Sequence, residues 1–311
     1  MIIVFGSVSS DMVFKVSRLP QAGETIIGTD YDITSGGKGA NQAFAAARMG
    51  AKVALVGCAG NDGASVRLLN KLKREGVRTA GVSESPDKLT GCAIIIRDKD
   101  GRKQAVMAQG ANMDAKADQV PDEILLPSNI VLMQMEVDPV ENQALIDRAH
   151  ERGTKTIMNL APAVHLPEAT FKKLDYLIVN EIEARQIAKP LNIDIEKNAL
   201  QLAHALSRMG DLTCIITLGA GGSRAVTKDG KEYSVPALKL DAFIDITGAG
   251  DAYCGTFAAA LQNGMSVYKA MKYASVAATL SCKSRGAQDS FPYISEIEEN
   301  LPLLDDQTKV N

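Results

Sequence analysis

Several residue types are scarce in this chain of 311 residues, and each scarcity argues against a class of protein. Tryptophan is absent, aromatic residues make up 5%, and there are three histidines and five cysteines. The net charge is −3 and no basic tract or aromatic-interleaved patch appears, which argues against nucleic acid as a partner. The N-terminal apolar run ends at Gly6 and is too short for a signal peptide or a membrane span. We therefore expect a cytoplasmic protein with no membrane partner.

The cysteines and histidines predict neither a disulfide framework nor a metal site. The cysteines are odd in number, widely spaced and mostly in apolar context, which is typical of reduced core residues. They are Cys58, Cys92, Cys214, Cys254 and Cys282. The histidines show no ligand spacing, so we expect them to be structural or on the surface.

What the chain does contain is an alternation of short apolar runs with longer helical patterns, and this predicts an α/β fold with a mostly parallel sheet. The hydrophobic content of 46% allows one large core. The expected strands are residues 2–5, 52–58, 130–134, 156–159, 176–179 and 214–218. Sites in such sheets lie beyond the carboxyl ends of the strands, which makes Glu136, Asn159, Asn180 and Gly219 candidates by position.

Two stretches, residues 13–33 and 90–107, interrupt this alternation. They lack helical periodicity and carry β-type runs at residues 25–27, 92–96 and 104–107. We expect these runs to pair into a small separate sheet. Such a sheet is either a lid over the site or a hairpin pair without function.

The segment Asp-Ile-Thr-Gly-Ala-Gly-Asp, which ends at Asp251, is the strongest functional signal. Gly248 and Gly250 permit unusual backbone angles and precede a small-residue run at 252–260 that predicts a packed helix. The amides of Ala249, Gly250 and Asp251 would then converge at a helix N-terminus, where proteins hold phosphate. Asp251 is either a plain helix cap or a base that takes a proton from an attacking hydroxyl. The second role fits phosphoryl transfer.

A second glycine cluster at residues 35–42 precedes an alanine-rich helix but lacks the spacing of a Walker phosphate loop. Gly36 and Gly37 let a ligand approach the backbone, and Asn41 offers both a donor and an acceptor to sugar hydroxyls. Lys38 is either an anion contact or a solvated charge at the helix start.

Taken in order, these segments resemble the motif set of the PfkB carbohydrate kinases, and within that family they are most similar to ribokinases. The similarity runs nearly end to end. It is carried by residues 6–11, 20–25, 36–41, 133–136, 159–163, 180–183, 217–219, 245–251 and 286–288. It implies an ATP-dependent kinase that phosphorylates a primary hydroxyl, with a ribokinase-like three-layer sandwich and a small β-sheet lid that often forms a dimer clasp.

The resemblance also implies a division of the chain. Residues 1–10, 35–89 and 113–311 would form the main nucleotide- and sugar-binding domain. Residues 11–34 and 90–112 would form the lid, through which a homodimer would assemble.

Matched position by position, the resemblance implies roles for individual residues. The base would be Asp251, beside an anion hole at Gly248, Ala249 and Gly250. The sugar would be bound by Ser9, Asp11, Gly36, Gly37, Lys38, Asn41 and Glu136. ATP would be bound by Asn180, Glu183, Thr217, Gly219, Gly222, Gly250 and Ser275. Asn180 and Glu183 match a motif that organises Mg²⁺ and phosphates, although alone they read equally as the first turn of a helix.

The family further implies a monovalent cation, K⁺, near the anion hole. The matching positions are Asp245, Thr247, Ser281, Ser284, Gly286 and Ser290, several of them through backbone carbonyls. Without the resemblance, residues 281–290 read as an ordinary loop.

Two departures bear on substrate and nucleotide. Ser9 stands where ribokinases usually have asparagine, and Ser275 stands where some have histidine. The expected substrate is a furanose, D-ribose first. The alternatives are a nucleoside, fructose or ketogluconate kinase, and a sugar-binding regulator without catalysis. The few aromatics disfavour a nucleoside kinase, and the complete Gly-Ala-Gly-Asp segment disfavours the regulator.

Overall fold

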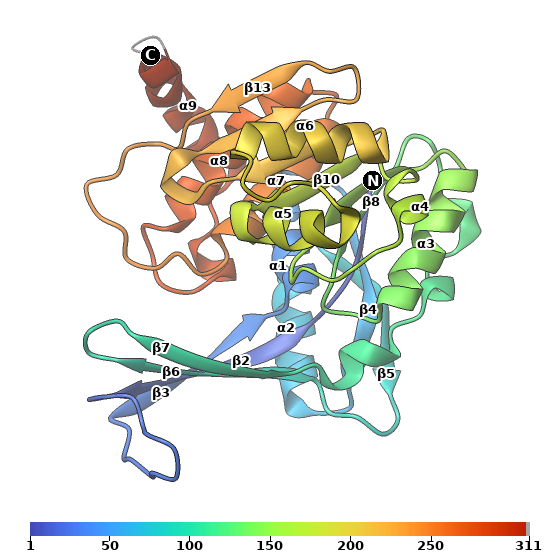
Figure 1. Ribbon diagram of the computed structural model, residues 1–311. Helices are drawn as coiled ribbons and strands as arrows, with labels where there is room; N and C mark the ends of the chain where they lie inside the picture. The colour runs from blue at the N-terminus through green and yellow to red at the C-terminus, as the bar shows by residue number, and fades with distance from the viewer. Residues whose placement is uncertain (309–311) are drawn as a thin grey trace.

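The structure is a computed structural model that describes the backbone of residues 1–308 and the side chains of residues 1–304. It consists of a large sheet covered by helices and a small sheet that projects from this body (Figure 1). No helix within the described residues is both long and apolar enough to cross a membrane.

The large sheet has nine strands in the order β13-β12-β11-β10-β9-β8-β1-β4-β5. All its pairings are parallel except those at the β11-β12-β13 edge. The strands are β1 (Ile2–Phe5), β4 (Val53–Gly60), β5 (Arg78–Ser85), β8 (Ile130–Gln134), β9 (Lys155–Asn159), β10 (Tyr176–Asn180), β11 (Thr213–Thr217), β12 (Ser223–Val226) and β13 (Glu232–Val235). The six predicted strands are confirmed within two residues at each end. The strands β5, β12 and β13 lie at or near the sheet edges. They contain polar residues, so the search for apolar runs did not predict them.

Helices cover both faces of the large sheet, so the predicted three-layer sandwich is confirmed (Figure 1). Successive strand side chains alternate, so Ile2 and Val4 join one core while Ile3 and Phe5 join the other. One layer contains α1 (Lys38–Arg48), α2 (Gly63–Arg74), α7 (Ala249–Gln262), α8 (Val267–Ser281) and α9 (Ile294–Thr308). The other contains α3 (Pro139–Glu151), α4 (Glu168–Phe171), α5 (Glu181–Ala188) and α6 (Ala199–Gly210). The 3₁₀ turns are η1 (Gly110–Asp114), η2 (Ala117–Gln119), η3 (Asp122–Ile124), η4 (Lys189–Leu191), η5 (Gly219–Gly221) and η6 (Gln288–Ser290).

The small sheet has four strands in the order β3-β2-β6-β7, which confirms the prediction that the two interrupting stretches pair with each other. Its strands are β2 (Ser9–Val16), β3 (Asp30–Gly36), β6 (Gly91–Asp98) and β7 (Lys103–Ala108). The expected β-type run at residues 25–27 is wrong, because this segment is a loop and β3 begins only at Asp30. Ile27 is 93% exposed, so its β propensity finds no partner surface.

All five cysteines are free, and four of them are buried, as the sequence predicts. The exception to burial is Cys92 on β6, which is partly exposed.

Candidate active site

The predicted helix after the Gly-Ala-Gly-Asp segment is α7, and Gly248 is its N-cap. Gly248 has φ 80°, a left-handed conformation that disfavours other residues. A Cβ at Gly248 would also lie 2.7 Å from the Cβ of Ala287. Glycine is therefore needed at this position both for its backbone angle and for close packing.

Two amides at the start of α7 are free to bind an anion, one fewer than expected. The Ala249 amide donates to the carbonyl of Ile246 at 3.2 Å, so it is already engaged. The amides of Gly250 and Asp251 have no hydrogen-bond partner within the described part of the chain. Both lie at the positive end of the helix dipole, where a phosphate would be stabilised.

Asp251 lies in the first turn of α7, and its carboxylate is held by two side-chain amides. It is 6% exposed. Its Oδ2 accepts a hydrogen bond from Asn41 Nδ2 at 2.9 Å, and its Oδ1 accepts one from Gln42 Nε2 at 3.0 Å. Both donors belong to α1, which packs against α7. The sequence pointed to Asn41 but missed Gln42, although a glutamine among the buried alanines of α1 was a visible signal.

Further side-chain amides form hydrogen bonds to Asn41 and Gln42 and hold them in place. Gln42 Nε2 also donates to Asn159 Oδ1 at 3.0 Å, and Gln134 Nε2 donates to Gln42 Oε1 at 2.8 Å. Gln288 Nε2 donates to Asn41 Oδ1 at 3.1 Å. Asn159 was a candidate because it ends a strand, and the structure does place it in the network around Asp251.

Asp11 lies on β2, at the base of the small sheet. Ser9 Oγ donates to Asp11 Oδ1 at 2.7 Å. A Cβ at Gly36 would lie 2.2 Å from Asp11 Oδ2, so glycine is required there for the carboxylate to fit. Burial raises the pKa of the Asp11 carboxyl above its usual value, and the hydrogen bond from Ser9 only partly offsets this.

Glu136 follows β8 and faces the start of α1. Its Oε2 accepts hydrogen bonds from Ser7 Oγ at 2.6 Å and from the amide of Lys38 at 2.9 Å. Gly37, the N-cap of α1 with φ 89°, would place a Cβ 2.8 Å from the Ser7 carbonyl oxygen. Burial would lower the pKa of the Lys38 amine, but the carboxylates of Asp251 and Glu136 outweigh it and hold this pKa above its usual value. Lys38 is thus electrostatically coupled to the carboxylates of this site.

Asn180 and Glu183 form a capping box at the start of α5. Asn180 Oδ1 accepts from the Glu183 amide, and Glu183 Oε2 accepts from the Asn180 amide, both at 2.8 Å. Burial raises the pKa of the Glu183 carboxyl. Asn180 and Glu183 therefore form the first turn of a helix, which is one of the two roles expected for them. One carboxylate oxygen of Glu183 remains outside the capping box.

The other positions expected to bind nucleotide lie at and beyond the end of β11 and on α8. Gly219 begins the turn η5 and Gly222 is its C-cap, and both have positive φ, 55° and 80°. Thr217 Oγ1 donates to the Val179 carbonyl at 3.4 Å. Ser275 is 3% exposed and donates to the Pro236 carbonyl at 2.6 Å, so its hydroxyl is engaged within the protein.

The residues expected to hold a monovalent cation come from two adjoining segments. Asp245 Oδ1 accepts from Thr247 Oγ1 at 2.7 Å, and Asp245 Oδ2 accepts from the Gly286 amide at 3.2 Å. Ser281 and Ser290 are buried and donate their hydroxyls to carbonyls of their own turns, whereas Ser284 is exposed. The described residues contain no cluster of three or more histidine, cysteine or acidic side chains able to hold a metal.

Arg97, which the sequence did not point to, connects the small sheet to this segment. Its Nη2 lies 3.5 Å from Asp245 Oδ1. Burial would raise the pKa of Asp245, but hydrogen bonds from Thr247 and Gly286 and the charge of Arg97 hold it below its usual value.

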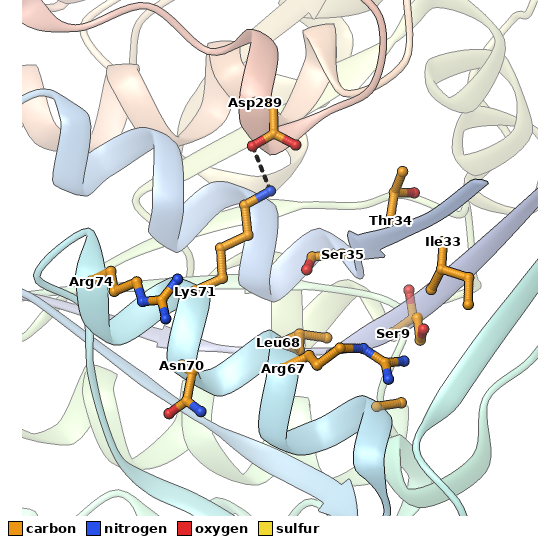
Figure 2. A pocket seen from close by; sticks show the side chains of 12 residues that line it. Ser9, Ile33, Thr34, Ser35, Arg67, Leu68, Asn70, Lys71, Arg74 and Asp289 are labelled. Carbon is orange, nitrogen blue, oxygen red and sulfur yellow. Dashed lines mark ion pairs between the residues drawn. The ribbon is translucent and has the colours of Figure 1, made fainter.

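A hollow of about 500 Å³ also lies beside the base of the small sheet (Figure 2). It is lined on one side by Arg67, Lys71 and Arg74 of α2, and Lys71 pairs with Asp289 at 2.6 Å. Asp251, Asp11 and Glu136 do not line this hollow, but Ser9, one of the positions expected to bind the sugar, does. The hollow therefore adjoins the site through Ser9.

Comparison with known proteins is consistent with this geometry. The model of the pfkB family carbohydrate kinases matches residues 1–294. A ribokinase of Bacillus subtilis is 36% identical over 96% of this chain and 99% of its own. A deoxyribokinase of Salmonella typhimurium is 30% identical over 97% of this chain and 99% of its own.

Solved structures show the same fold. A Thermotoga maritima ribokinase superposes with a TM-score of 0.89 and 32% identity, over 97% of this chain and 99% of its own. An Arabidopsis thaliana ribokinase complexed with ribose and ATP superposes with a TM-score of 0.87 and 26% identity, over 96% of this chain and 98% of its own. The match to the family model spans nearly the whole chain, and the chain belongs to the PfkB family of carbohydrate kinases.

Proposed function

We propose that this protein is an ATP-dependent sugar kinase that phosphorylates the primary hydroxyl of a furanose, with D-ribose as the first candidate and ribose 5-phosphate as the product. The observation that carries the proposal is the arrangement around Asp251. A buried carboxylate held by neutral amides lies beside two free amides at a helix N-terminus. One group can accept a proton and the others can bind the phosphoryl oxygens, which is what phosphoryl transfer requires.

In the proposed reaction, a carboxylate oxygen of Asp251 accepts the proton of the sugar hydroxyl. The hydroxyl oxygen then forms a bond to the γ-phosphorus, the bond from that phosphorus to the β–γ bridging oxygen breaks, and ADP leaves. The amides of Gly250 and Asp251 stabilise the charge on the phosphoryl oxygens. Gly248 and Ala249 shape the turn that presents them.

The sugar would bind between the small sheet and α1. Asp11 and Glu136 accept hydrogen bonds from sugar hydroxyls, with Asn41 and Ser9 beside them. Gly36 and Gly37 allow Asp11 and the Ser7 backbone to pack closely beside the sugar, and Lys38 balances the charge of the carboxylates. The small sheet would act as a lid, residues 11–34 and 90–112, on a main domain of residues 1–10, 35–89 and 113–311.

The nucleotide would bind along the ends of β10 and β11. Its contacts would be Asn180, Glu183, Thr217, Gly219, Gly222 and Gly250, with Ser275 contributing packing at the base end. The free oxygen of Glu183 suits Mg²⁺, which usually binds through one or two carboxylates together with substrate phosphates. Bound there, Mg²⁺ would neutralise phosphate charge during transfer.

The Asp245 segment suits a monovalent cation such as K⁺, because the Gly286 hydrogen bond brings a carboxylate and a turn with several carbonyls together. Asp245, Thr247, Ser281, Ser284, Gly286 and Ser290 would hold it, mostly through backbone carbonyls. The hydroxyls of Ser281 and Ser290 are engaged with carbonyls of their own turns, which leaves the backbone as the main donor set.

We further propose a cytoplasmic homodimer that assembles through the lid. The register of the small sheet places Asp11, Val13 and Arg97 on the inner face. The outer face carries apolar residues, several of them exposed: Met12, Phe14, Tyr31, Ile33, Ile94, Ile96 and Val106. A second copy of the same face would cover them.

The test is ADP release measured with ribose, deoxyribose, fructose, ketogluconate and nucleosides, for the wild type and for Ser9→Asn. Losing a hydrogen bond to a substrate hydroxyl costs about 0.5–1.5 kcal/mol. If ribose is the substrate and a water fills the space beside Ser9, Ser9→Asn should bind ribose at least as well. If the space receives a larger substituent, Ser9→Asn should block that sugar and spare ribose. No turnover of any sugar or nucleoside would contradict the proposal.

A further inference from the structure

The buried amides around Asp251 form a network whose orientation is fixed at its ends. A carboxylate and a backbone carbonyl can only accept hydrogen bonds. Asn159 Nδ2 donates to the Ile178 carbonyl at 3.0 Å, so Asn159 Oδ1 faces Gln42, and Gln42 must present its Nε2 to both Asn159 and Asp251. On the other arm, Asn41 presents Nδ2 to Asp251, so Asn41 Oδ1 faces Gln288, which must donate.

We infer that Gln288 is a positioning residue for Asp251 that acts through Asn41. The inference rests on the proposed function, in which Asp251 is the base. Asn41 can rotate about its terminal bond, and its two ends are nearly equal in shape. The acceptor-only carboxylate of Asp251 favours the Nδ2 end of Asn41, and the hydrogen bond from Gln288 Nε2 to Asn41 Oδ1 reinforces this orientation. Asp251 Oδ2 then accepts a hydrogen bond from Asn41 Nδ2, which holds the carboxylate in one orientation.

Gln288 is well placed for this role because the turn that carries it is rigid. It begins η6, where Ser290 Oγ donates to the Ala287 carbonyl at 2.7 Å. Ala287 packs against Gly248 at the start of α7, and Phe291 is buried against Phe44. The Lys71–Asp289 pair also holds the turn (Figure 2), but the Asp289 side chain is 70% exposed, and exposed pairs contribute little. The buried contacts therefore do most of the positioning.

A purely structural role fits Gln288 less well. Gln288 is 1% exposed, and its Oε1 has no hydrogen-bond partner among the described residues. A buried acceptor without a partner costs stability. Replacing Gln288 would remove this orphan acceptor while creating another at Asn41 Oδ1. We therefore expect the melting temperature to change little, whereas a residue selected for stability would show a clear loss.

The test compares steady-state kinetics of Gln288→Met and Gln288→Glu. We expect Gln288→Met to lower kcat about tenfold, the size of one lost oriented hydrogen bond, with the KM for ATP within about twofold. We expect Gln288→Glu to be worse, because its ionised carboxylate attracts Asn41 Nδ2 and turns Asn41 Oδ1 towards Asp251. Because a buried carboxylate also costs stability, kcat is compared for the folded fraction of each variant, and equal kcat values for Gln288→Glu and Gln288→Met would show that the orientation of the Asn41 amide does not matter.

Gln262→Met is the matched control. Gln262 ends α7, its Nε2 donates to the Ser128 carbonyl at 2.9 Å, and its Oε1 also lacks a partner among the described residues. We expect wild-type kcat from this variant. Adding Gln288→Met to Asp251→Asn should cause no further loss of residual turnover, because the two act as one unit.

The outcomes separate this inference from the proposed function. Substantial turnover by Asp251→Asn would overturn the base role itself. An inactive Asp251→Asn together with Gln288 variants that match Gln262→Met would overturn the positioning role alone. Should Gln288→Met fail to fold, Gln288→Glu decides: wild-type kcat in this variant would also overturn the inference.

Discussion

At the scale of single residues, the proposed reaction uses carboxylates that lie in different surroundings. Asp251 is held by two neutral side-chain amides, each of which donates one hydrogen bond to the carboxylate and so orients it. Asp11 lies in a partly buried position that disfavours its charged form. The first arrangement suits a base. The surroundings of Asp11 suit a carboxylate that binds the substrate and lowers the free energy of unfolding while no substrate is bound.

Asp11→Asn should therefore separate binding from stability. Because the pKa of Asp11 is raised in the folded state, its contribution to stability is present at low pH and is lost as the pH rises through that raised pKa. We expect Asp11→Asn to be more stable than the wild type at pH 7, with the difference shrinking as the medium becomes acidic. The KM for the sugar should rise at least about tenfold, because hydrogen bonds to charged groups contribute about 1.5–3 kcal/mol.

Urea unfolding across pH and sugar-dependent kinetics check these two expectations. An Asp11→Asn variant that is less stable at neutral pH would contradict the cost assigned to the buried charge. Unchanged KM would remove Asp11 from the sugar site.

At the scale of elements, the site is assembled where the starts of α1 and α7 meet the base of the small sheet. The Arg97–Asp245 contact joins the far part of this sheet to the segment before α7. Arg97 and Lys103 are paired on neighbouring strands and face the same side. Within the described residues Arg97 makes an ion pair and Lys103 makes none. Substituting Arg97 therefore tests the contact with Asp245, and substituting Lys103 is the control.

Arg97→Met should weaken closure of the lid. The Asp245 side chain is 9% exposed, so this pair is less screened than a surface pair. We expect the KM values for sugar and ATP to rise about three- to tenfold, a loss of about 1 kcal/mol, with a smaller effect on kcat. Lys103→Met should leave both KM values unchanged. Equal effects of the two substitutions in steady-state kinetics would show that general charge, and not this contact, holds the lid.

At the scale of the whole molecule, the proposed homodimer would cover the exposed outer face of the small sheet. Val106 is 65% exposed and lies on β7, an edge strand of the small sheet. We expect a species of twice the chain mass of 33.1 kDa in sedimentation analysis. Val106→Asp should shift it to the monomer, whereas Val140→Asp on α3, an equally exposed residue, should not. A wild-type monomer at micromolar concentration would contradict assembly through this face.

The sequence predicted the features that depend on local patterns and missed those that depend on contacts between residues far apart in the chain. The apolar runs identified the inner strands, and the Gly-Ala-Gly-Asp segment identified the start of α7, because both signals are local. Gln42 and Gln288 escaped because their partners lie 209 and 247 residues away. Likewise, nothing near Arg97 in the sequence indicates Asp245. Long-range polar contacts leave no periodic pattern in a single chain, so only the folded structure brings them together.

The most direct measurement of the central claim is the turnover of Asp251→Asn with the best sugar and ATP, alongside calorimetric binding of each. Asparagine keeps the shape of the side chain but cannot accept the proton, and general bases contribute about 10²–10⁴-fold. We predict that turnover is abolished while sugar and ATP binding remain largely intact. Residual activity above about a tenth of the wild type would contradict the role of Asp251 as the base.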